Sequence, residues 1–117
     1  HICADTSPAW TDPATCVFHF FAYLLFHPRV CTVRYENLVG PRGGGTAETQ
    51  VAEVRKVMEF LESPGDPVSI ANNLYDPESP TFHMGRIDTW RQYFTQEHMD
   101  LFLKYHPGLL ELYGYSL

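Results

Sequence analysis

The chain is poor in cysteine and contains no motif typical of a metal site. Its three cysteines, Cys3, Cys16 and Cys31, are an odd number at wide spacings. This argues against the disulfide framework of a small secreted domain. No Cys-x-x-Cys or His-x-x-x-His pair is present, so no zinc site is predicted. We therefore expect reduced thiols, a cytoplasmic protein and no bound metal.

Basic charge and long apolar runs are also scarce. The chain has eight basic and 14 acidic side chains, which gives a net charge of -6. Domains that bind nucleic acid are usually basic, so we expect no nucleic-acid partner, although a local basic cluster could still hold a small anion. The longest apolar stretch, from Val17 to Phe26, is too short to span a membrane and is interrupted by His19 and Tyr23. No membrane span is expected.

Helical patterns dominate what the sequence does contain. The 117 residues are 44% hydrophobic and 15% aromatic, which suits one domain or part of one, over residues 1–117. An irregular lead-in is expected over 1–14. Thr46 and Thr95 are suitable N-caps. Helices are predicted over 15–27 (buried), 46–62 (with Val51, Val54, Met58 and Leu61 inward), 68–74, 96–105 and 107–113, with a helical turn over 88–93.

One segment has the composition of a strand. Residues 29–35, with the sequence RVCTVRY, alternate and are rich in β-branched side chains. A single strand lacks partners for its backbone hydrogen bonds. The chain is therefore expected either to be a fragment of a larger α/β protein or to pair with another copy of itself.

A glycine-rich loop follows this segment, from Gly40 to Thr46. Gly40 and Gly45 have the spacing of a phosphate-binding P-loop, but Thr46 stands at the lysine position and Ala47 at the hydroxyl position. A short-chain P-loop nucleotide-binding protein is thus disfavoured. A flexible surface connection is the favoured interpretation of the loop.

Two further motifs, in this order, carry the functional signal. The first is Arg34-Tyr35-Glu36-Asn37-Leu38 with its glycine-rich extension. The second is the stretch 79–95, SPTFHMGRIDTWRQYFT. Together with the closing 110–115, LELYGY, they resemble the C-terminal portion of sulfotransferases, in a bacterial-like branch. These enzymes transfer a sulfuryl group from 3'-phosphoadenosine-5'-phosphosulfate (PAPS) to a hydroxyl or amine of a small-molecule acceptor. The matches in the second motif are Thr81, Phe82, Gly85, Trp90, Arg91, Phe94 and Thr95.

The resemblance implies a mostly helical part of a P-loop-kinase-like α/β fold, with one or few parallel strands. It also implies a site for PAPS or its product PAP, with Tyr35 near the adenine. His83 and Met84 stand where the family has Arg and Lys, and Asp88 where it has Gly.

The implied cofactor-binding residues are Tyr35, His83, Met84, Gly85, Arg86 and Trp90. A phosphate needs converging N–H donors and positive charge, which the backbone of Gly85 and the fork of Arg86 could supply. Several of these assignments have an alternative. Tyr35 could be a packed aromatic residue, His83 a surface loop histidine, and Trp90 with Phe94 could simply cover the core. At the position of Arg86 the family itself often has a residue that is not a ligand.

Two functional hypotheses follow. In the first, the chain bears part of the cofactor site of a sulfotransferase, whose lysine-containing first loop and catalytic base belong to the family's other half; no catalytic residue is assigned. In the second, it is an inactive sulfotransferase-derived module that self-associates as a homo-oligomer.

Overall fold

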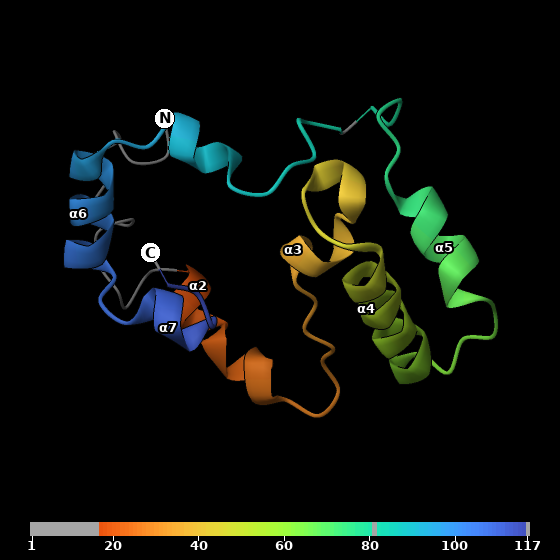
Figure 1. The fold of residues 1–117 in the computed structure, drawn as a ribbon. Helices are drawn as coiled ribbons and strands as arrows, with labels where there is room; N and C mark the ends of the chain where they lie inside the picture. Colours follow the sequence, from red (N-terminus) through yellow and green to blue (C-terminus); the bar gives the residue numbers. More distant parts are fainter. Residues whose placement is uncertain (1–16, 81, 117) are drawn as a thin grey trace. The chain divides into compact units, whose positions relative to one another are not determined.

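A computed structural model describes residues 17–80 and 82–116 (Figure 1). The expected lead-in, Cys3, Cys16 and Thr81 lie outside these residues. The chain divides into two units. One is Cys31–Thr89, and the other combines His1–Val30 with Trp90–Leu117. Each is described by itself below.

The unit Cys31–Thr89 is built around its longest helix, α4. Its helices are α3 (Tyr35–Leu38), η2 (Pro41–Gly43, a 3-10 turn), α4 (Ala47–Phe60) and α5 (Pro67–Leu74). Helix α4 packs against both α3 and α5 (Figure 1). As predicted, Thr46 caps α4, with its hydroxyl accepting from the Thr49 N–H at 3.1 Å. Asp66 caps α5 in the same way.

The expected strand over 29–35 is wrong. Residues 31–34 form no ladder, and Tyr35 already begins α3. Side chains of α4 replace the missing strand partner. The Arg34 N–H donates to Glu53 Oε1 at 3.2 Å, and Lys56 Nζ donates to the Thr32 carbonyl at 2.8 Å. Two backbone groups of this segment, the Thr32 carbonyl and the Arg34 N–H, are therefore satisfied by one helix rather than by a sheet.

The buried face of α4 is partly polar. Val54 is buried as predicted, together with Val39 and Ala71, but Leu61 is 64% exposed. Gln50 and Glu53 are buried instead. Gln50 Nε2 donates to the Leu38 carbonyl at 2.8 Å. The two polar side chains thus hold the segment that leads into the glycine-rich loop.

Glu53 is the main polar anchor of this unit. It accepts hydrogen bonds from the Arg34 N–H, from Asn37 Nδ2 at 3.1 Å and from Lys56. Burial raises the pKa of Glu53, but the bonds from Lys56, Asn37 and Arg34 outweigh it, so the pKa lies below the ordinary 4.5. A carboxylate with a lowered folded-state pKa adds stability that is complete above its unfolded value and is lost as the pH falls.

We therefore expect Glu53→Gln to destabilise the chain by about 1.5–3 kcal/mol at pH 7, the range for hydrogen bonds to charged groups. The difference from wild type should shrink as the pH falls below 4.5 and through the lower folded-state pKa. Urea unfolding, followed by the circular dichroism signal of the helices at several pH values between 3 and 7, measures this difference in stability. Glu59→Gln, at an exposed position of the same helix, is the control. A pH-independent difference would contradict the assigned role.

The second unit contains α2 (Val17–Phe20), η1 (Ala22–Phe26), α6 (Gln96–Tyr105) and α7 (Leu109–Leu112), with η3 (Thr89–Gln92) at the boundary. Thr95 caps α6 as predicted, in a reciprocal arrangement with His98. The Tyr113 hydroxyl donates to the Phe18 carbonyl at 2.7 Å. This bond joins the segment after α7 to α2, which lie side by side in Figure 1.

The prediction of one buried helix over 15–27 is wrong for the part that the structure describes. The segment is a short α-helix followed by a 3-10 helix. Its large side chains are exposed, including Phe20 at 66% and Phe26 at 78%. An apolar composition all round predicts burial only where enough chain is present to cover every face.

Over residues 17–80 and 82–116 the fold is helical, and this range contains no strand. The expectation of a mostly helical chain agrees with this. None of the helices described is both long and apolar enough to cross a membrane.

Candidate functional site

The two sequence motifs meet within the unit Cys31–Thr89. The Ile87 N–H donates to the Gly43 carbonyl at 2.9 Å. A Cβ placed on Gly43 would lie 2.4 Å from the Gly85 carbonyl oxygen and 2.0 Å from Val39 Cγ2. Only glycine permits this approach of the two backbones. The glycine-rich loop is therefore packed directly on the segment 82–87.

Hydrogen bonds within the glycine-rich loop give it a defined form. The Gly43 and Gly45 N–H groups both donate to the Gly40 carbonyl, at 3.1 and 2.8 Å. Gly40 has φ +66°, and a Cβ there would lie 2.3 Å from Gln50 Oε1. The buried Gln50 side chain thus packs against the loop. The interpretation of the loop as a flexible surface connection does not predict this contact.

Arg42 and two aromatic rings line the junction of the two motifs. The Arg42 guanidinium lies 5.2 Å from the centre of the Tyr75 ring and donates from Nη1 to the Tyr75 carbonyl at 3.1 Å. Tyr75 meets Phe82 edge to face, with ring centres 5.4 Å apart. The ideal Cβ of Gly85 would lie 2.7 Å from Phe82 and 3.1 Å from Tyr75. A cation and aromatic faces thus converge next to Gly85.

Tyr35 belongs to the same cluster. It is the first residue of α3, and its side chain is half exposed. Partial burial, the neighbouring Tyr75 and the Glu36 carboxylate together raise the pKa of Tyr35. Its phenol therefore stays neutral at physiological pH and presents a half-exposed flat ring.

The segment 83–85 adopts a strained backbone. Met84 has φ +56°, a left-handed conformation that costs a non-glycine residue roughly 1–2 kcal/mol. The Gly85 N–H donates to the His83 carbonyl at 2.6 Å. A phosphate that uses this N–H must displace the carbonyl. The side chains of His83 and Met84 are exposed at this turn.

Arg86 is exposed, and its carbonyl accepts from Thr89 Oγ1 at 2.7 Å. Asp88 has φ +61°, the left-handed region that favours glycine. The family motif that the sequence resembles has glycine at this position. The backbone here thus has the conformation for which glycine is best suited.

Trp90, the remaining candidate, lies in the other unit. Its ring meets Phe94 edge to face at 5.9 Å, and the Arg91 guanidinium lies 4.5 Å from its centre. This contact is compatible with the structural alternative for Trp90 and Phe94, which stays a prediction.

The structure places Gly43 against Gly85 and Tyr35 near Tyr75, and it adds Arg42 and Tyr75, which sequence reasoning did not assign. Arg42 was visible in the sequence as the cation of the Gly-Pro-Arg-Gly-Gly-Gly loop. Tyr75 stands in a stretch without a recognisable motif, so no signal could have selected it.

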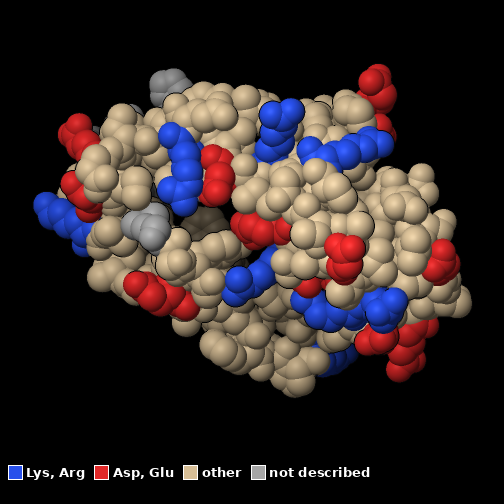
Figure 2. Space-filling model, viewed as in Figure 1, with Lys and Arg blue, Asp and Glu red and all other residues tan. Residues whose placement is uncertain are grey.

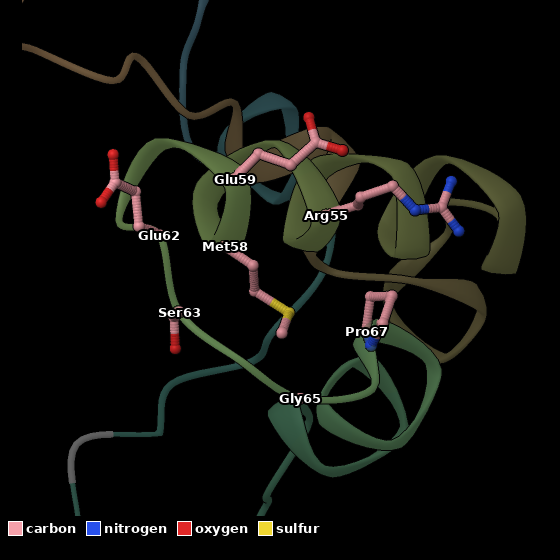
Figure 3. Close-up of a pocket in the computed structure, with 7 residues that line it drawn as sticks. All are labelled: Arg55, Met58, Glu59, Glu62, Ser63, Gly65 and Pro67. Carbon is pink, nitrogen blue, oxygen red and sulfur yellow. The ribbon is translucent and has the colours of Figure 1, made fainter.

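A shallow hollow of about 250 Å³ lies elsewhere in this unit, between the end of α4 and the start of α5. Figure 3 shows Met58 pointing toward Gly65 and Pro67, while Glu59 and Glu62 point outward. The Cε of Met58 would lie 3.2 Å from a Cβ on Gly65. The hollow is a loosely filled packing gap and contains none of the candidate residues.

Charge is mixed over the visible surface. Figure 2 shows lysine and arginine side chains interspersed with acidic ones. Within the described ranges, no group of three or more His, Cys, Asp or Glu residues is placed to hold a metal ion.

Comparisons with known proteins add no relative: no protein-family description, curated protein or solved structure matches the chain.

Proposed function

We propose that this chain is part of a PAPS-dependent sulfotransferase and that residues 31–89 carry part of the cofactor site. In this proposal the helices belong to an α/β fold whose parallel strands come largely from the family's other half. The cofactor is PAPS, or PAP after transfer, and the acceptor is a small molecule. The catalytic residues are not assigned to this chain.

The observation that carries the proposal is the contact between the glycine-rich loop and Gly85. Two motifs about 40 residues apart resemble one family, and they pack backbone to backbone. Such contact between the two motifs is expected if both bind one ligand. The left-handed Asp88, at the family's glycine position, supports the same proposal.

Arg42 places a positive charge at this junction. One of its five N–H donors is used by the Tyr75 carbonyl, which leaves the others for an anion. The rings of Tyr35, Tyr75 and Phe82 provide flat faces that suit a purine. A purine nucleotide with a phosphate near Gly85 is therefore the ligand that this chemistry fits.

We expect PAP to bind the purified chain, and Arg42→Ala to weaken binding by at least about tenfold, since a hydrogen bond to a charged group contributes about 1.5–3 kcal/mol. Calorimetric titration measures both. Arg55→Ala, which removes an exposed arginine of α4, is the matched control. Adenosine 5'-phosphate, which lacks the 3'-phosphate, should bind more weakly. Millimolar or absent PAP binding would refute a functional nucleotide site.

A second candidate function is self-association, favoured by the exposed aromatic residues of α2 and η1. Phe18, Phe20, Tyr23 and Phe26 are 57–78% exposed. The exposed share of four such side chains amounts to roughly 400–650 Å². A stable interface buries about 800 Å² per partner. The segment 17–26 carries no Lys, Arg, Asp or Glu that would oppose contact with its own copy.

If this candidate is correct, light scattering after size exclusion should give at least twice the monomer mass. The double variant Phe20→Ser/Phe26→Ser should shift the chain toward monomer, because it removes the two most exposed rings. Val68→Ser/Leu74→Ser, at exposed apolar positions of α5, is the control. A cooperative monomer in the wild type would exclude this function.

A further inference from the structure

Two histidines that are far apart in the sequence lie side by side in the unit formed by His1–Val30 and Trp90–Leu117. His19 belongs to α2, and His106 is the C-cap of α6. Their ring centres are 5.7 Å apart, with an angle of 31° between the ring planes. Neither residue is part of the sulfotransferase-like motifs, so this pair is independent of the function proposed above.

Both rings carry a buried nitrogen without a partner. The Nδ1 atoms of His19 and His106 are inaccessible to solvent, and neither has a hydrogen-bond partner within the described part of the chain. A buried polar atom left unsatisfied costs about 1–3 kcal/mol, and native structures keep few of them. Two such atoms on neighbouring rings call for a shared explanation.

Contacts outside the pair hold the two segments that carry these rings. The Phe102 ring lies 5.4 Å from that of His106, and the His106 N–H donates to the Phe102 carbonyl at 2.8 Å. On the other side, the Tyr113 hydroxyl donates to the carbonyl of Phe18, the residue before His19, and this bond holds α2. The backbone beside each imidazole is thus held by a hydrogen bond, and the His106 ring also contacts Phe102.

A transition-metal ion fits this spacing. Zinc binds histidine nitrogen at about 2.0–2.1 Å, usually in tetrahedral geometry. Two imidazoles on one such ion have ring centres roughly 5–6 Å apart, when the ion lies in the plane of each ring. The observed 5.7 Å falls within this range. Imidazole ligands select zinc, copper or nickel rather than magnesium or calcium, which prefer oxygen.

We propose that His19 and His106 form a two-ligand site for a divalent transition-metal ion. The ion would link α2 to the end of α6. Because these two elements are far apart in the sequence, the link would restrict the unfolded chain strongly. It would stabilise the folded chain by mass action, because an unfolded chain does not hold the two rings together.

The test uses Zn²⁺ with the full chain, first stripped of metal by a chelator. We expect one ion to bind in calorimetry and to raise the melting temperature. His19→Gln and His106→Gln should each lose at least about tenfold in affinity, whereas His27→Gln, at an exposed position, should bind like wild type.

A measurement on the wild-type chain covers the case in which a variant does not fold. In ¹⁵N spectra of the imidazole groups, Zn²⁺ should shift the nitrogens of His19 and His106 and leave those of His27 and His83 unchanged. Equal shifts of all histidines, unaltered affinity in both variants, or no binding at millimolar Zn²⁺ would each overturn the proposal. The last result would identify the pair as a packing contact only.

Discussion

The double variant His83→Arg/Met84→Lys should bind PAP about a hundredfold more tightly than the wild-type chain. Both substitutions place cations at the exposed turn next to Gly85, where the resembling family carries Arg and Lys. A charged hydrogen bond contributes about 1.5–3 kcal/mol, and 1.4 kcal/mol corresponds to a factor of ten. Two new contacts therefore give roughly two orders of magnitude. Calorimetric titration of PAP measures the effect.

The control must separate local contacts from net charge. Ala52→Arg/Asn72→Lys adds the same two charges at exposed positions of α4 and α5. It should leave the affinity within a few-fold of wild type, because it adds the same net charge without a cation at the turn next to Gly85. An equal gain in both double variants would mean nonspecific attraction. No gain in the first would contradict a phosphate site beside Gly85.

The helices were the most predictable part of the fold, because their signals are local. Thr46 and Thr95 cap helices, and Ser63-Pro64-Gly65 ends one. Each of these signals acts only on residues a few positions away. The strand prediction failed for the opposite reason. A strand depends on a partner elsewhere in the chain. Here, Glu53 of α4 bonds the Arg34 N–H and Lys56 bonds the Thr32 carbonyl instead.

The candidate site was predictable only as far as its motifs. Tyr35 and Gly85 were selected by resemblance, and they lie in one unit. Arg42 and Tyr75 were not selected, because their importance comes from a contact between residues 33 positions apart. The polar role of α4 was missed as well. An apolar stripe predicts the inward face of a helix, but it does not predict that Gln50 and Glu53 turn inward to bind backbone.

The largest effect on stability is expected from Gly43→Ala. The new methyl group would lie 2.0 Å from Val39 Cγ2 and 2.4 Å from the Gly85 carbonyl oxygen. A buried side-chain atom can shift, but the carbonyl is backbone and is tied in through the Ile87 bond to Gly43. Overpacking costs about 1–3 kcal/mol and occasionally more, and we expect a cost of about 3 kcal/mol because backbone must move.

Gly44→Ala is the matched control for this prediction. Gly44 has φ +99°, and the nearest atom to its ideal Cβ, on Ile87, is 4.0 Å away. It should therefore lose only the roughly 1–2 kcal/mol of a left-handed conformation, without a clash. Urea unfolding followed by circular dichroism compares the two variants. Gly43→Ala should also abolish PAP binding, because the glycine-rich loop can no longer lie against Gly85, whereas Gly44→Ala should keep it. If the two variants lose equal stability and both bind PAP, the two motifs do not meet as described, and the observation that supports a shared nucleotide site is lost.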